Sequence, residues 1–130
     1  MENTYVLFDD TKEAVIIDPG CYEKHEEDEL VEYIEAHSLS VKLLLNTHGH
    51  IDHVLGNPFV KKYFQVPLWI GTHDGSTLKS VETYASNYGF HKYQTSEPEH
   101  LIDEGDTISF GTSELQIVFV PGHAPGHIAF

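Results

Sequence analysis

Residues 43–53 read LLLNTHGHIDH, an apolar run that leads directly into a cluster of histidines. The three leucines end a run that starts at Val41, which predicts a buried strand. In extended backbone, residues i and i+2 point to the same side, so His48 and His50 can reach one ion together. Imidazole and carboxylate ligands suit zinc, iron, manganese or nickel. The residues of this stretch that offer such ligands are His48, His50, Asp52 and His53.

The position of this cluster also indicates a functional site. In open α/β sheets, ligands collect at the carboxyl ends of strands, which is where the cluster falls. Gly49 removes crowding between the two histidines and permits unusual backbone angles. Asp52 and His53 come as the chain turns toward a helix, so they can face a second ion. The alternative is a histidine-rich surface loop at a helix start, and the apolar strand before the cluster argues against it.

A second histidine segment, PGHAPGH at residues 121–127, again follows an apolar run. By itself, His123 would be interpreted as a turn or capping residue. Beside the first cluster, it is predicted to be the third ligand of the first ion. His127 is interpreted as a packing or supporting histidine.

Two interpretations stay open for Asp18, which also follows an apolar run: a turn residue, or a carboxylate that orients a ligating histidine. The sole cysteine, Cys21, excludes an internal disulfide and is interpreted as a small packing residue. The other histidines lack ligand spacing and are expected at or near the surface: His25, His37, His73, His91 and His100.

The pattern of apolar residues predicts an alternation of strands and helices. Strands are expected at residues 5–8, 14–17, 41–45, 67–70, 107–110 and 115–120, with a further strand that begins at 127. Helices are expected at about 23–37, from 57 through 64, and at about 74–88, with a polar loop at 89–98. The first two strands form a hairpin, and the strand–helix–strand order from 41 to 70 implies a parallel, right-handed crossover.

The charge balance is strongly acidic, because seven lysines and no arginine stand against 21 acidic residues, for a net charge of −14. Arginine is best suited to bidentate phosphate recognition, so this composition argues against nucleic acid as a partner. No run approaches the roughly 20 apolar residues that span a membrane, and residues 1–5 lack the basic start of a signal peptide. We therefore expect one domain over residues 1–130 that is located in the cytoplasm and has neither nucleic acid nor a membrane as a partner.

Three of these segments together resemble the metallo-β-lactamase superfamily. THGHIDH at residues 47–53 is similar to its signature, while AVIIDPG at 14–20 and VPGHAPGHI at 120–128 are similar to the glyoxalase II-like (hydroxyacylglutathione hydrolase-like) branch. The resemblance implies an α/β fold, the αβ/βα sandwich of two mixed sheets with outer helices. It implies a first ion held by His48, His50 and His123. It implies a second ion at Asp52 and His53, with zinc as the metal and iron or manganese as alternatives.

The chemistry that this resemblance implies is hydrolysis of a thioester or related ester by metal-activated water, with Asp52 as the catalytic residue that positions the water. Two alternatives stay open: an iron-dependent persulfide dioxygenase on the same scaffold, and a metal-binding fragment without activity. In the family, an aspartate and a histidine from later in the chain complete the second site, whereas this sequence ends at Phe130. We therefore expect a domain that is incomplete at the C-terminus and forms homo-oligomers through exposed sheet surface.

Overall fold

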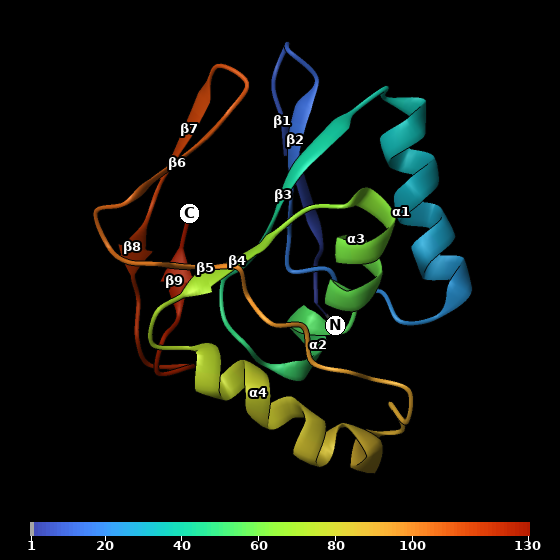
Figure 1. The fold of residues 1–130 in the computed structure, drawn as a ribbon, viewed down its shortest axis with the longest axis vertical. Coiled ribbons are helices and arrows are strands. Elements are labelled where there is room, and N and C mark those ends of the chain that lie inside the picture. Colours follow the sequence, from blue (N-terminus) through green and yellow to red (C-terminus); the bar gives the residue numbers. More distant parts are fainter. Residues whose placement is uncertain (1) are drawn as a thin grey trace.

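The computed structural model describes residues 2–130 and centres on a five-stranded sheet in the order β1-β2-β3-β4-β5 (Figure 1). Its strands are β1 (Tyr5–Phe8), β2 (Glu13–Ile17), β3 (Ser40–Asn46), β4 (Leu68–Gly71) and β5 (His100–Ile102). β1 and β2 form an antiparallel hairpin, and β2 through β5 run parallel. Parallel neighbours need crossover connections, which contain helices α1 (Lys24–Ala36), α3 (Asn57–Phe64) and α4 (Gly75–Tyr84). The predicted hairpin and the predicted parallel crossover are both confirmed.

The central strands are apolar on both faces because each face of the sheet is covered. Successive side chains of a strand point to opposite faces. Ile16 and Leu44 accordingly pack in one core with residues of α3 and α4. Val15 and Leu45 pack in a second core on the other face, with side chains such as Ile108 from the C-terminal strands. Each fully buried aliphatic side chain of this kind contributes roughly 1.5–3 kcal/mol, so the two cores fix the register of the sheet.

The C-terminal strands cover the face that the helices leave open. β6 (Thr107–Phe110) pairs antiparallel with β7 (Ser113–Gln116), and β8 (Val118–Phe119) pairs antiparallel with β9 (Ile128–Ala129). The prediction of one continuous strand over residues 115–120 is wrong, because β7 ends at Gln116 and β8 is a separate strand. The chain changes partner at Ile117, which is buried in the second core between the two short strands. An apolar run shows that a segment is buried, but it does not show which strand pairs with it.

Two short elements, β5 and helix α2 (Ile51–Val54), escaped prediction. β5 exposes His100 and Leu101 and buries Ile102, so it carries little alternating pattern. Helix α2 is one turn long. The helix predicted at about 74–88 is present as α4 and the 3₁₀ helix η1 (Ala85–Tyr88), which continues directly from it. α2 matters for the site because it carries Asp52 and His53. No helix in the described part of the chain is long and apolar enough to cross a membrane.

Candidate metal centre

Three imidazole rings from two distant segments meet at the carboxyl end of β3. His48 and His50 come from the loop after β3, and His123 comes from the loop between β8 and β9. One ligand atom from each of the three lies within 4.8 Å of the other two. Nδ1 of His50 is 3.1 Å from Nε2 of His123, although the residues are 73 positions apart. The structure therefore brings together the three side chains that were predicted to hold the first ion.

Backbone hydrogen bonds explain why the two loops meet. The amide of Ile128 donates to the carbonyl of Thr47 at 3.0 Å, so β9 starts beside the end of β3. The amide of Val120 donates to the carbonyl of His127 at 2.9 Å and extends the pairing of β8 with β9. The loop of residues 121–127 is thus closed at its base, while His123 within it is exposed.

His48 is the buried member of the group, with 1% of its surface exposed. Its Nδ1 lies 2.9 Å from the hydroxyl of Thr47, whereas its Nε2 has no hydrogen-bond partner among residues 2–130. Burial, followed by the neighbouring His53 and His127, lowers the pKa of His48 to about 4. The ring is therefore neutral at pH 7, which is the form that binds metals. A buried nitrogen without a partner is costly unless something binds it, and a metal ion bound here would do so.

Asp18 positions the loop after β3, which carries His48 and His50 and is called the first loop below. Its carboxylate, 3% exposed, accepts hydrogen bonds from the amide of Thr47 at 2.8 Å and from the hydroxyl of Thr47 at 2.6 Å. Its Oδ2 also lies 3.1 Å from Nδ1 of His53. Burial lowers the pKa of His53, but the hydrogen bond and charge of Asp18, with the charges of Asp52 and Glu2, more than offset this, so the net pKa is raised. Of the two interpretations of Asp18, these contacts favour the orienting carboxylate.

The residues predicted for a second ion lie side by side but differ in surroundings. Asp52 Oδ2 is 3.7 Å from Nε2 of His53, and the Asp52 side chain is 58% exposed. Within residues 2–130, His53 groups with Asp18 and His48 as a set of potential ligands, whereas Asp52 joins no set of three. The described residues thus offer a set of three ligands for the predicted first ion and a second set that includes His53 but not Asp52.

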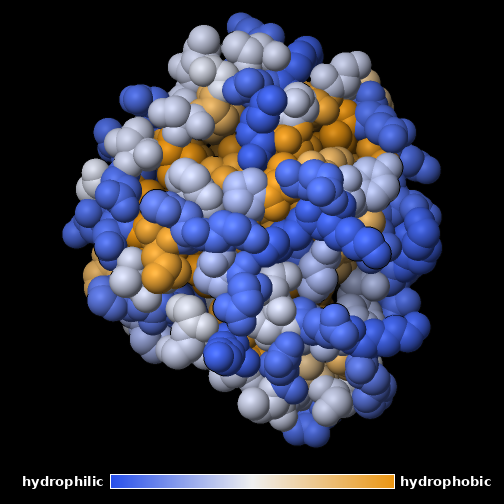
Figure 2. Space-filling model, viewed as in Figure 1, coloured by the Kyte–Doolittle hydropathy of each residue, from blue (hydrophilic) through white to orange (hydrophobic). Residues whose placement is uncertain are grey.

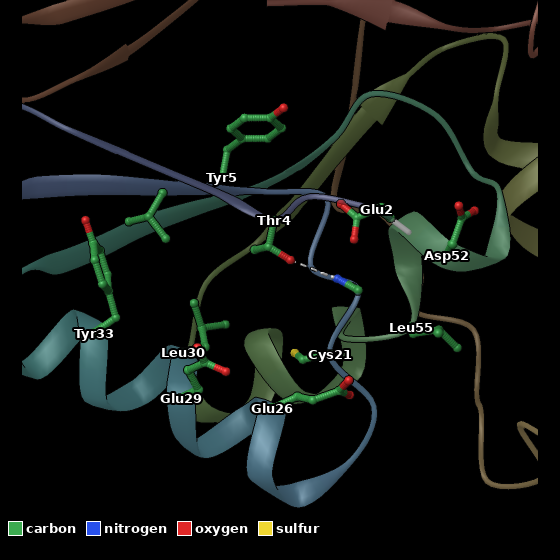
Figure 3. Close-up of a pocket in the computed structure, with 12 residues that line it drawn as sticks. Glu2, Thr4, Tyr5, Cys21, Glu26, Glu29, Leu30, Tyr33, Asp52 and Leu55 are labelled. Carbon is green, nitrogen blue, oxygen red and sulfur yellow. Dashed lines mark hydrogen bonds between the residues drawn. The ribbon is translucent and has the colours of Figure 1, made fainter.

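Two cavities adjoin Asp52. A cavity of about 560 Å³ reaches the ligand rings, and its lining consists of His50, Ile51, Asp52, Tyr84, Asn87, Tyr88 and His123. A cavity of about 650 Å³ lies between the N-terminal segment and α1, with Glu2 close to Asp52 at one end (Figure 3). Burial raises the pKa of Glu2 to about 7, against the opposing charge of His53. The first of these cavities is the one in contact with the imidazole cluster.

The remaining histidines fall into two groups, one half-buried residue beside the site and five exposed residues, as their spacing in the sequence predicts. The ring of His127 is half-buried and packs 4.5 Å from the ring of His48, and burial lowers its pKa. The five histidines without ligand spacing are all exposed. Sequence reasoning missed Thr47, Tyr84 and Tyr88, which contact or line the site. Thr47 directly precedes His48 and could have been suspected, but nothing in the local sequence marks the two tyrosines.

A sheet with helices on one face, strand hairpins on the other and a histidine cluster at the end of a central strand defines a metal-binding α/β domain. Residues 1–130 match the metallo-beta-lactamase superfamily, and the chain belongs to that family. The fold class predicted from the sequence is confirmed, since solved structures of this fold superpose on nearly the whole chain.

Several individual proteins are similar to the chain. The hydroxyacylglutathione hydrolase GloC of Haemophilus influenzae is 34% identical over 131 residues, which cover 99% of this chain and 60% of that protein. The probable metallo-hydrolase YqgX of Bacillus subtilis is 28% identical over 129 residues, which cover 98% of this chain and 59% of that protein. Among solved structures, a di-iron-bound form of TTHA1623 has a TM-score of 0.80 at 25% identity, covering 97% of this chain and 59% of that one. The B3 metallo-beta-lactamase BLEG-1 has a TM-score of 0.75 at 28% identity, covering 97% and 59%. The chain thus spans about 60% of the length of these relatives.

Proposed function

We propose that the chain is a metal-dependent hydrolase that acts on a thioester or a related ester. The observation that carries the proposal is that His48 groups with His50 and His123 as potential ligands of one ion, while its buried Nε2 has no hydrogen-bond partner among residues 2–130. Membership of the metallo-beta-lactamase superfamily supports hydrolysis as the class of reaction. The name of the GloC relative supports a hydroxyacyl-glutathione as the kind of substrate.

The donor set fits a borderline metal ion. His48, His50 and His123 would hold it through neutral imidazole nitrogens, as zinc and iron sites require. When bound, the ion supplies Lewis acidity to the substrate carbonyl and lowers the pKa of water to about 7. Asp52 and His53 are the proposed ligands of a second ion. Zinc is our first choice of metal, with iron and manganese as alternatives, and iron is present in the di-iron-bound form of TTHA1623.

Asp52 is the proposed catalytic residue. Its exposed carboxylate lines the same cavity as His50 and His123, so it can hold a water molecule against the substrate carbonyl and accept the proton of that water. The water oxygen then bonds to the carbonyl carbon, the carbon–sulfur bond breaks, and the leaving thiolate takes up the proton that Asp52 accepted. The cavity of about 560 Å³ is large enough for a small-molecule substrate. The lining residues Tyr84, Asn87 and Tyr88 offer neutral polar contacts and aromatic faces to such a substrate.

Metal analysis combined with a thioester assay tests the proposal. We expect one or two metal ions per chain when the protein is purified without added metal. We expect thiol release from a hydroxyacyl-glutathione, lost in His123→Ala and kept in His25→Ala, which changes an exposed histidine on α1. A metal-loaded chain that cleaves neither thioesters nor esters would refute the hydrolase, and a chain that holds no metal would refute the centre.

An iron-dependent persulfide dioxygenase is the alternative enzyme on this scaffold. It would consume oxygen in the presence of a persulfide, whereas the hydrolase would not, so an oxygen electrode separates the two.

We also propose a cytoplasmic location and self-association. Self-association is supported by apolar surface that includes Val118, Phe119 and Val120, each 37–49% exposed. Figure 2 shows hydrophobic patches among hydrophilic residues on the face it draws. A single monomer peak in sizing chromatography would rule out self-association.

A further inference from the structure

One fully buried carboxylate joins the two segments that carry the histidines. Asp74, the residue before α4, is 0% exposed. Its Oδ2 accepts a hydrogen bond from the amide of Gly49, which lies between His48 and His50. Its Oδ1 accepts a hydrogen bond at 3.1 Å from the amide of Gly126, which immediately precedes His127. Nothing in the local sequence marks Asp74, because its contacts join three segments far apart in the chain.

Both glycines lie against the start of α4. A Cβ atom on Gly49 would approach the amide nitrogen of Leu78 to 2.4 Å, and one on Gly126 would approach the amide nitrogen of Asp74 to 2.4 Å. Neither segment could come this close to the helix with a larger residue at that position. The two loops are therefore docked side by side on the first turn of α4.

The side chain of Asp74 does not form the hydrogen bond that is usual at the N-cap of a helix. An aspartate in the N-cap position normally accepts a hydrogen bond from an amide in the first turn of its own helix. The Asp74 side chain makes no such cap hydrogen bond. Both of its oxygens are directed instead to the loops, so its contacts serve the relative placement of the loops rather than the start of the helix.

We propose that Asp74 is a positioning residue that sets the distance between the segments carrying His48, His50 and His123. This inference rests on the proposed metal centre. His123 is exposed, and its ring lies 4.7 Å from that of His50 and 5.0 Å from that of His48. Without the carboxylate, two buried amides lose their acceptor, and the loop of His123 is free to move away from the first loop. Asp74 thus prepares the three-histidine site before the ion arrives.

Cobalt titration of three variants tests this role. Asp74→Asn keeps the shape of the side chain but replaces one acceptor by a donor. Asp74→Ser restores a good helix cap while losing the reach to both loops. Val81→Ala, a fully buried position on the same helix, is the control for general loss of stability. Each is titrated with Co²⁺ at a temperature where the metal-free protein is folded, and the visible absorption of the bound ion is recorded.

We expect both Asp74 variants to bind Co²⁺ at least about tenfold more weakly than the parent and with an altered visible spectrum, as for loss of a residue that supports ligands. The Val81→Ala variant should melt at a lower temperature but keep the parent affinity and spectrum. In the metal-free protein, the amides of Gly49 and Gly126 should exchange hydrogen faster in the Asp74 variants only. If Asp74→Asn does not fold, the comparison of Asp74→Ser with Val81→Ala decides.

Parent-like affinity, spectrum and amide exchange in the Asp74 variants would overturn the inference and leave the metal centre intact. An equal loss of affinity in Val81→Ala would also overturn it, because the effect would then follow from stability alone. A parent chain that binds no Co²⁺ would remove the metal centre and this inference together.

Discussion

The loop after β3 and the loop between β8 and β9 supply the same kind of side chain from different surroundings. In the first loop, His48 is almost fully buried, and Asp18 holds Thr47 and His53 in place. In the second loop, Pro121 and Gly122 are exposed along with His123 itself. The first loop therefore presents a preformed ligand, and the second completes the site from the solvent side. This asymmetry predicts that damage to the first loop is more severe than equal damage to the second.

The largest effect is expected for His48→Ala. It should remove the first ion and with it the stabilisation that binding gives the folded state, about 4 kcal/mol when free metal exceeds the Kd by 1,000-fold. His123→Ala should weaken the same ion but leave it bound at high metal concentration, because His48 and His50 remain. Elemental analysis and thermal melts with and without metal compare the two. An unchanged metal content in His48→Ala would contradict the assignment of the site.

A smaller effect is expected for Asp18→Asn. The amide can accept from only one of its two terminal atoms, so the hydrogen bonds to Thr47 and His53 are no longer all satisfied. Loss of such a supporting partner typically lowers metal affinity by about 10–100-fold. Competition with a chelator measures the affinity, and Asp10→Asn in an exposed turn is the matched control. Equal affinities for the Asp18 and Asp10 variants would show that the first loop does not depend on this carboxylate.

The last expected effect concerns the pH dependence of the metal-free protein. The pKa of His48 is lowered to about 4, so between about pH 6.5 and pH 4 the unfolded chain takes up a proton that the folded chain refuses. This group therefore makes the fold less stable as pH falls through that range. His53 and Glu2 have raised pKa values and act in the opposite direction: their protonated forms are favoured in the folded state, and the benefit is lost as pH rises through those values.

Urea unfolding of the parent and of His48→Ala across this pH range isolates the contribution of His48. We expect the stability lost on acidification to be smaller in the variant than in the parent, because the variant lacks the buried ring. The same loss in both proteins would mean that the His48 ring titrates as it does in the unfolded chain. That result would contradict the burial of His48 that distinguishes the first loop from the second.

Much of the fold could be predicted from residue order. The hairpin of β1 with β2, the long helix α1 and the strand that leads into the histidines all followed from the spacing of apolar residues. These elements are long or fully apolar, so their pattern is strong. β5 and the division at Ile117 were not predictable in the same way, because short strands take their pairing from neighbours far along the chain.

The candidate ligands themselves were predictable, whereas their supports were not. His48, His50 and His123 stand out because each follows an apolar strand at a spacing that suits one ion. Asp74 stands out only in three dimensions, since its two hydrogen-bond donors lie 25 and 52 residues away.

By itself, the sequence determined the long strands and helices and the side chains that could bind a metal, because periodicity and ligand spacing are properties of neighbouring residues. Only the tertiary structure decided that His123 comes within 3.1 Å of His50, that Asp18 supports the first loop and that Asp74 links the two. Those contacts join residues from distant parts of the chain, and packing of the whole sheet and its helices is what brings such residues together.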